Sequence, residues 1–151
     1  MNYKKLDNLF KQARIIAENS KDEETKVGCL IVNKDCETLA TGYNGFVRNA
    51  NDNNLPRVRP DKYIYTIHSE VNAIYQAASR GVALKEGICI CTLSPCVSCL
   101  RALYQCNIRT VYFEKEYRDF SKQLNMKDLI ICLTNEGKYT KIEMRGSKNE
   151  K

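Results

Sequence analysis

The sequence predicts an α/β fold, a three-layer α-β-α sandwich in which helices cover both faces of a mixed five-stranded sheet. Segments with helical and strand-like spacing follow one another in the order α-β-β-α-β-α-β-α-β, which is typical of a layered α/β domain. One of the strand-like segments is apolar without interruption, as expected of a strand that is buried on both faces. The 151 residues show no repeat and no linker long enough to divide them, so we expect residues 1–151 to form a single domain.

The first half of the chain contains a predicted helix, a predicted hairpin and a long loop. Residues 3–19 place their apolar side chains on one helical face. The segments VGCLIV (27–32) and ETLATGY (37–43) indicate two strands that the turn NKDC joins into a hairpin. Residues 44–62 form a polar loop rich in Asn, Pro and Arg, and long loops in compact domains are often functional.

The second half alternates helices and strands. Apolar residues recur at helical spacing from Ser69 to Arg80, and Gly81 is a typical C-terminal stop. GICICTL (87–93) is the uninterrupted apolar strand. The remaining predicted elements are a helix at about 96–106, a strand IRTVYF (108–113), a helix near 120–134 with Met126, Leu129, Ile130 and Leu133 in register, and a final strand KYTKIEM.

Composition excludes several classes of protein. The chain is 43% hydrophobic and 28% charged, and no window approaches eighteen apolar residues, so we expect no membrane span. The N-terminus mixes charges throughout and lacks the apolar region of a signal peptide, which predicts a cytoplasmic protein. The formal net charge of +6 fits phosphate-bearing partners and an ordinary basic surface equally well.

Eight cysteines in a chain without an export signal indicate reduced thiols or metal ligands rather than disulfides. Five of them lie in apolar segments, where a free cysteine packs as a small buried hydrophobe. These are Cys29, Cys89 and Cys91 in strand-like segments and Cys106 and Cys132 in helix-like ones, whereas Cys36 falls in a turn and receives no role.

His68, the only histidine, combines with Cys96 and Cys99 into a candidate zinc site. A C-x-x-C pair alone is also compatible with a redox pair or with half of a structural zinc site. Two thiolates and one imidazole, however, leave one position of a tetrahedral zinc open, which is the catalytic arrangement. Glu70 is close enough to move protons for a zinc-activated water, although it could also serve only as a helix-capping carboxylate. The joint pattern H-S-E…P-C-V-S-C matches the signature of zinc nucleobase deaminases.

On these motifs the chain resembles the deoxycytidylate (dCMP) deaminases of the cytidine deaminase superfamily. The match rests on SKDEETKVGCLIV (20–32), TGYNGF (41–46), KYIYTIHSEVNAI (62–74), TLSPCVSCLRALYQCNIRTVYF (92–113) and KEYRD (115–119). The resemblance implies a cytidine deaminase-like fold and zinc-dependent hydrolysis of dCMP to dUMP and ammonia, which supplies dUMP for thymidylate synthesis. It also implies activation by dCTP, inhibition by dTTP and a homo-oligomer, commonly a hexamer.

The resemblance assigns roles to individual residues. It makes His68, Cys96 and Cys99 the zinc ligands and Glu70 the proton shuttle. Residues 47–67 contain no further Cys or His, so we expect one Zn²⁺ per chain. The implied substrate contacts are Asn44 on the deoxyribose, the backbone of Ser69 and Ser94 on the base, Ser20, Lys21 and Lys26 around the 5′-phosphate, and Tyr117 near the substrate. The implied regulator contacts are Tyr43, Gly45, Arg48, Arg57 and Arg59, with Mg²⁺ accompanying a nucleoside triphosphate.

Two alternatives remain open at the level of sequence. The same chemistry could act on dCTP or on a base in tRNA or single-stranded DNA, but the chain lacks interleaved aromatic and basic residues, so we expect no nucleic-acid partner. A zinc-stabilised binding module without catalysis would instead need a fourth ligand in place of the open position.

Overall fold

Three helices cover a mixed six-stranded sheet in this computed structural model, which describes residues 1–117 and 129–147. The strand order is β2-β1-β5-β6-β8-β7. Strand β1 runs antiparallel to β2 and β5, β5 runs parallel to β6, and β8 runs antiparallel to β6 and β7. The strands are β1 (Gly28–Val32), β2 (Thr38–Tyr43), β5 (Ile88–Leu93), β6 (Thr110–Lys115), β7 (Ile130–Glu136) and β8 (Tyr139–Met144).

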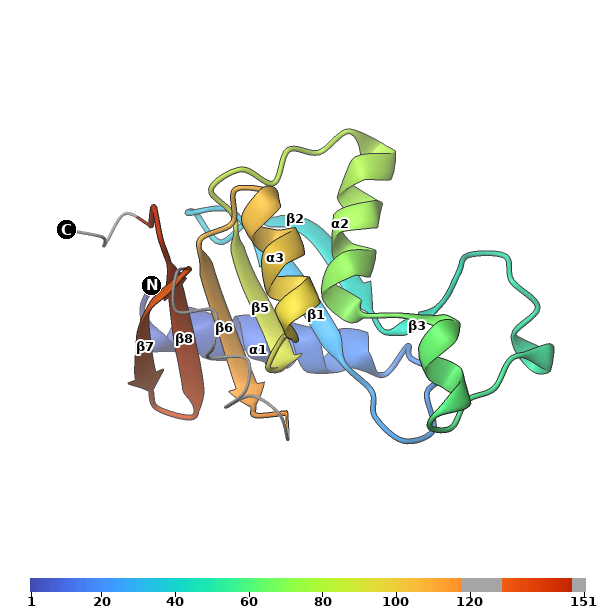
Figure 1. Cartoon of the computed structure of the whole chain (residues 1–151). Coiled ribbons are helices and arrows are strands. Elements are labelled where there is room, and N and C mark those ends of the chain that lie inside the picture. Colours follow the sequence, from blue (N-terminus) through green and yellow to red (C-terminus); the bar gives the residue numbers. More distant parts are fainter. Residues whose placement is uncertain (118–128, 148–151) are drawn as a thin grey trace.

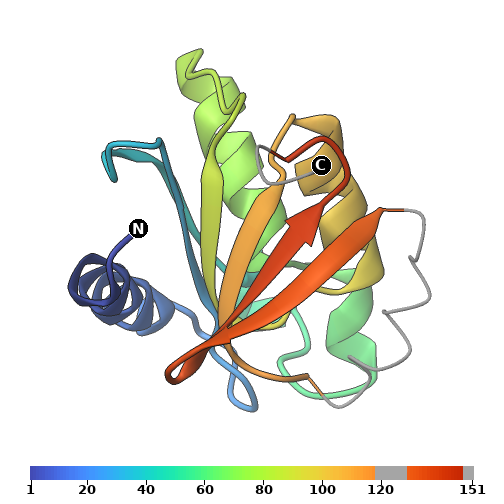
Figure 2. The same ribbon diagram turned by 90° about the vertical axis from the view of Figure 1, so that its left-hand side faces the viewer.

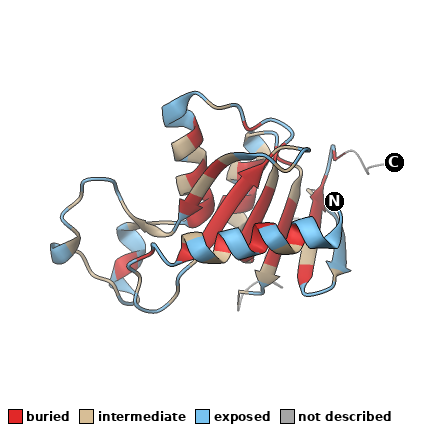
Figure 3. Cartoon of the chain, turned by 180° about the vertical axis from the view of Figure 1, so that it is seen from behind, coloured by how far each residue is buried: buried red, intermediate tan, exposed pale blue. Residues whose placement is uncertain are grey.

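The helices form one layer on each face of the sheet, as Figures 1 and 2 show. Helix α1 (Tyr3–Ala17) lies alone on one face, whereas α2 (Ser69–Arg80) and α3 (Val97–Gln105) cover the other. Seen from behind in Figure 3, α1 turns an exposed side to solvent and its buried side toward the sheet. The predicted three-layer α/β fold is therefore confirmed, with six strands in the main sheet rather than five.

Each helix buries the apolar stripe that its spacing predicts. On α1, Leu6, Phe10 and Ala13 pack on Leu30 and Ile90 of the central strands. On the opposite face, α2 and α3 enclose a second core around strands β1 and β5, where Cys29, Cys89 and Cys91 are buried as predicted.

The predicted helix near 120–134 is wrong over residues 130–134. Ile130–Glu136 forms strand β7, while Met126 lies outside the described residues. The reason is the tight turn at Gly137, whose φ of +65° suits glycine and lets β7 pair along its length with β8. Backbone pairing thus outweighs the helical spacing of the apolar residues. Cys132, expected in a buried helix, is exposed on this strand.

The long polar loop carries short elements of its own. Together with the segment up to residue 67, it contains β3 (Gly45–Phe46), two 3₁₀ turns (Asp52–Asn54 and Asp61–Ile64) and β4 (Thr66–Ile67), which pairs with β3. In Figure 1 this segment extends away from the sheet and returns to the start of α2. In the described part of the chain, no helix combines the length and the apolar character needed to cross a bilayer.

Candidate active site

Two helix starts bring the three candidate ligands together. His68 is the N-terminal cap residue of α2 and Cys96 that of α3, and Cys99 lies in the first turn of α3. The approach of α2 to the sheet depends on Gly42 in β2, because a Cβ there would stand 2.2 Å from the carbonyl oxygen of Ser69. Glycine therefore fixes how close the first turn of α2 lies to strand β2.

The spacing of the ligand atoms fits a zinc ion. Nδ1 of His68 lies 3.3 Å from Sγ of Cys99 and 3.4 Å from Sγ of Cys96, and the two sulfur atoms are 3.5 Å apart. A tetrahedral zinc with ordinary Zn–S and Zn–N bonds separates such atoms by about 3.5–3.8 Å. The two thiols and the imidazole thus form a nearly preformed three-ligand set, the only group of three or more metal-ligating side chains found within the described residues.

Hydrogen bonds within the cluster favour a thiolate. The contact with Cys99, together with the one to His68, lowers the pKa of Cys96 to about 4 although burial opposes the shift. The same contact raises the pKa of Cys99. The bond to Cys96 also raises the pKa of His68. A soft thiolate beside an imidazole is a donor set that suits zinc.

Glu70 lies beside the cluster, in the first turn of α2. Its side chain is buried, with 3% of the residue exposed. Its Oε1 accepts hydrogen bonds from the hydroxyl of Ser69 and, at 3.0 Å, from the thiol of Cys91 on β5. The carboxylate is therefore held in place by the protein while it forms part of the cavity wall next to His68 and Cys96.

A cavity of about 250 Å³ opens over these residues. It brings together most of the predicted catalytic and substrate-contacting residues, namely His68, Glu70, Cys96, Asn44, Ser69, Ser94 and Tyr117. The backbone N–H of Tyr117 donates to Oγ of Ser94 at 2.7 Å, so these two lining residues are linked directly.

The side chain of Asn44 is already engaged with the backbone. Its Oδ1 accepts from the N–H of Val27 at 2.8 Å, and its Nδ2 donates to the carbonyl oxygen of Thr25 at 2.9 Å. Ser20 is buried behind it and donates to the carbonyl oxygen of Asn44. Asn44 thus also holds the segment before β1 against the cavity.

The predicted lysines do not line this cavity. Lys26 is exposed outside it, and Lys21 forms a 2.8 Å ion pair with Asp52 in a second cavity. The cations that do line the first cavity are Arg59 and Lys62. Sequence reasoning places Arg59 at a regulatory site and overlooks Lys62. The only signal for Lys62 is its position within the matched segment 62–74.

Lys62 and Arg59 are paired with acidic side chains from the segment before β1. Nζ of Lys62 lies 2.9 and 3.0 Å from the two carboxylate oxygens of Asp22, and Lys62 is buried. Arg59 contacts Glu24 at 3.2 Å and donates from Nε to the hydroxyl of Tyr63 at 2.7 Å. These pairs tie the returning loop to the segment that precedes β1.

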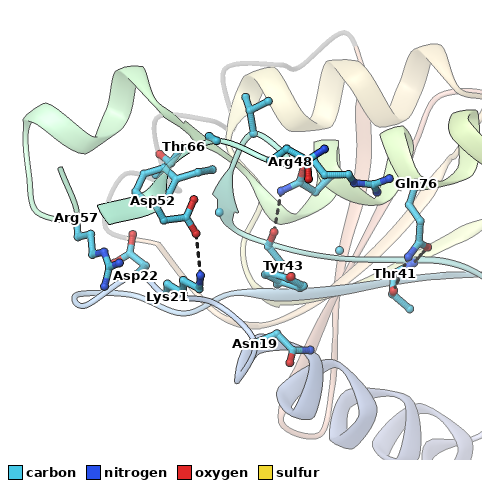
Figure 4. A pocket seen from close by; sticks show the side chains of 17 residues that line it. Asn19, Lys21, Asp22, Thr41, Tyr43, Arg48, Asp52, Arg57, Thr66 and Gln76 are labelled. Atoms are coloured by element: carbon cyan, nitrogen blue, oxygen red, sulfur yellow. Dashed lines mark hydrogen bonds and ion pairs between the residues drawn. The ribbon is translucent and has the colours of Figure 1, made fainter. Parts of the chain in front are cut away.

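The second cavity, of about 380 Å³, is shown from close by in Figure 4. Four of the five predicted regulator contacts line it, namely Tyr43, Gly45, Arg48 and Arg57. The sticks in Figure 4 show Lys21 facing Asp52 and the carbonyl of Tyr43 bonded to a neighbouring side chain, which is the amide of Asn72 at 2.8 Å. The fifth predicted contact, Arg59, belongs to the first cavity instead.

The fold and the His-Cys-Cys cluster together are those of the class of zinc-binding deaminase domains. Residues 3–115 match the sequence model of the family described as cytidine and deoxycytidylate deaminase zinc-binding region, and the chain belongs to this family.

The chain is similar to several deoxycytidylate deaminases. The chain is 35% identical over 114 residues to a probable deoxycytidylate deaminase of Caenorhabditis elegans, a match that covers 73% of this chain and 57% of that protein. It is 34% identical over 114 residues to the human deoxycytidylate deaminase, with 71% and 63% covered. The chain therefore spans less than two thirds of these curated relatives. A crystal structure of the dCMP deaminase from cyanophage S-TIM5 with dCMP and dUMP is similar, with a TM-score of 0.71, 27% identity and coverage of 83% and 93%.

Proposed function

We propose that this chain catalyses the hydrolytic deamination of dCMP to dUMP and ammonia, with one catalytic zinc per chain and dUMP as a precursor for thymidylate synthesis. One observation above all supports the proposal: a His-Cys-Cys cluster with zinc-ligand spacing lies beside a buried carboxylate in one cavity. The family match and the similarity to a dCMP deaminase with bound dCMP and dUMP support the choice of substrate.

Nδ1 of His68 and the sulfur atoms of Cys96 and Cys99 would hold the zinc. When bound, the ion supplies the Lewis acidity that activates a water for attack on C4 of the cytosine ring. His68 and Cys96 line the cavity while Cys99 is buried, so a zinc ion held by these residues would be reached from the cavity. The helix starts at His68 and Cys96 add a positive field that favours the thiolates.

Glu70 would carry the protons of the reaction. Its carboxylate accepts a proton from the attacking water and delivers it to N3 of the base. It then accepts the second proton of that water and passes it to the amino group, which leaves as ammonia when the C4–N4 bond breaks. Burial strengthens the interactions of this carboxylate with the developing charges, because little water competes for them.

Arg59 is our candidate for the 5′-phosphate in place of Lys21 and Lys26. Its guanidinium lines the substrate cavity, and a planar fork of N–H donors suits bidentate binding of phosphate. Lys62 is less suited to this role, because its ammonium group is buried against Asp22 with only 5% of the side chain exposed, whereas the Arg59 side chain is 33% exposed.

The second cavity is our candidate for the regulators dCTP and dTTP, with Mg²⁺ on the triphosphate. Arg48 and Arg57 on its wall support this proposal, since arginine forks suit phosphate groups. We further propose that the protein is cytoplasmic and assembles into a homo-oligomer, with a hexamer as the specific expectation.

A substrate panel tests the proposed function. Purified protein with one equivalent of zinc is assayed on dCMP, dCDP, dCTP and deoxycytidine, each with and without dCTP or dTTP as effector. We expect dCMP to be the preferred substrate, and we expect Glu70→Gln to lose at least about 10²-fold in kcat while retaining zinc. Turnover of cytidine or adenosine with no turnover of dCMP would contradict the substrate, and full activity of Glu70→Gln would contradict the mechanism.

A further inference from the structure

A buried thiol lies directly behind the carboxylate of Glu70. Cys91 is on the central strand β5 and is fully buried. Its Sγ is 3.0 Å from Oε1 of Glu70, the same oxygen that accepts the hydroxyl of Ser69. Sγ of Cys91 and Oγ of Ser69 are 3.7 Å apart, so both donors approach this oxygen from adjacent positions.

We propose that Cys91 is a positioning residue for the deamination. Its thiol and the hydroxyl of Ser69 together fix Oε1 of Glu70, and this leaves Oε2 to exchange protons with the water and the base. The inference rests on the proposed role of Glu70 as the proton carrier. It gives Ser69 a second task, through its side chain, beside the backbone contact that the resemblance assigns to it.

The direction of the hydrogen bond follows from the surroundings of the thiol. Burial raises the pKa of Cys91 to about 12, and the charge of Glu70 acts in the same direction although a contact with Cys29 opposes it. The thiol therefore keeps its proton at neutral pH. An ionised carboxylate can only accept, so the S–H group is the donor. A protonated thiol also does not compete with Cys96 and Cys99 for zinc.

The packing around Cys91 explains why a side chain has to provide this donor. The thiol lies in the core between the sheet and the helix layer, among Cys29, Ala73 and Leu100. Water has no place in such a close-packed cluster, so Oε1 would lose this partner if the thiol were removed. A carboxylate with three rotatable bonds would then have one donor fewer on Oε1, and small misplacements of a catalytic group reduce rate strongly.

Three variants test the positioning role, and strand β5 offers a matched control. Cys91→Val removes the donor at similar volume, Cys91→Ser keeps a donor, and Cys89→Val makes the first change at an equally buried position on the same strand. In the described part of the chain, the hydrogen-bond partner of Cys89 is Cys29 rather than Glu70.

We expect Cys91→Val to lower kcat for dCMP about 10- to 100-fold, with KM within about twofold and zinc content unchanged. Cys91→Ser should recover most of the rate, and Cys89→Val should stay within about twofold of the parent protein. The proposal would be overturned by an equal loss of kcat in Cys91→Val and Cys89→Val, or by an unchanged kcat in Cys91→Val. Either result would mean that Cys91 contributes only to packing.

Infrared spectroscopy of the S–H stretch gives a readout that does not depend on turnover. The band that Cys91→Ser removes should lie at lower frequency in the parent protein than in Glu70→Ala, because a hydrogen bond to a carboxylate weakens the S–H bond. An unshifted band would overturn the inference even if Cys91→Val failed to fold. A shifted band in a protein that does not deaminate dCMP would instead refute the proposed function, and with it the catalytic meaning of the contact.

Discussion

Replacing Lys62 by Met tests how strongly the buried ion pair beside the substrate cavity stabilises the fold. The side chains of Lys62 and Asp22 are only 5% and 6% exposed, and Nζ lies 2.9 and 3.0 Å from the two carboxylate oxygens. Glu24 adds a second acidic partner at 3.3 Å. Met retains a long apolar side chain, so the substitution mainly removes the charge.

The expected loss in free energy of unfolding is about 3 kcal/mol. Removing one partner of a buried pair costs about 3–5 kcal/mol, because the other charge stays buried without compensation. The lower end applies here, since Oδ1 of Asp22 also accepts the backbone N–H groups of Glu24 and Thr25 at 2.8 and 2.9 Å. Lys21→Met is the matched control. Its pair with Asp52 is 2.8 Å long, but Lys21 is 64% exposed, so its removal should cost less than about 1 kcal/mol.

The pH dependence of this loss has a definite sign. Burial raises the pKa of Asp22. Hydrogen bonds from the Thr25 N–H, from Lys62 and from the Glu24 N–H together lower the pKa by more than burial raises it, so the folded pKa lies below the ordinary value. The stabilisation is therefore present above the unfolded pKa of about 3.9 and disappears as pH falls through the folded value. Without Lys62 the burial remains and the pKa of Asp22 rises, so the deficit of Lys62→Met should shrink at acidic pH.

Urea unfolding followed by circular dichroism measures these differences at pH 7 and at pH 4. Comparison with Lys21→Met at each pH cancels any effect that zinc release has on both variants. A double variant, Asp22→Asn with Lys62→Met, should recover part of the loss because no charge stays unpaired. A deficit below about 1 kcal/mol for Lys62→Met, or one that does not change between the two pH values, would refute the reasoning.

Three further measurements examine the site. Gly42→Ala should lower the free energy of unfolding by about 1–3 kcal/mol and reduce zinc content, because its Cβ would stand 2.2 Å from a backbone oxygen of α2. Thermal melting and metal analysis measure these two effects. Gly45→Ala is the control, because the atom nearest to its Cβ would be 3.8 Å away. Arg59→Ala should raise KM for dCMP about tenfold in steady-state assays without affecting turnover of deoxycytidine. Chelation of zinc should abolish deamination and lower the melting temperature, and Zn²⁺ but not Mg²⁺ should restore both.

The helices and the buried strands were predictable because each has a regular apolar spacing that packing satisfies. The candidate ligand set was predictable for a related reason: His68 immediately precedes one predicted helix and the C-x-x-C pair opens another, and helix starts can meet at one edge of a sheet. Strand β7 was not predictable in this way, because its apolar residues also fit a helical register and the pairing with β8 is a tertiary interaction.

The division of the loop's basic residues between two cavities could not be predicted from sequence. Arg57 and Arg59 are two positions apart in an irregular segment, yet they line different cavities. In a strand or a helix the period would fix which face each side chain occupies, but a loop has no such period. Its side chains are instead directed by partners from elsewhere, such as Glu24 for Arg59.

The two cavities share part of their walls, and this gives the proposed regulation a physical route. Asp22 and Thr66 line both of them, and Asp22 is the partner of Lys62 on the substrate side. A nucleotide in the second cavity that displaces Lys21 from Asp52 would change the charge next to Asp22.

Thermodynamic linkage makes this coupling reciprocal. The factor by which an effector changes the affinity for dCMP equals the factor by which dCMP changes the affinity for that effector. Calorimetric titration of Glu70→Gln, which should bind dCMP without consuming it, can measure both factors. Unequal factors would show that the binding scheme is incomplete. Equal factors that both fall to one in Lys62→Met would identify the Asp22–Lys62 pair as the coupling element.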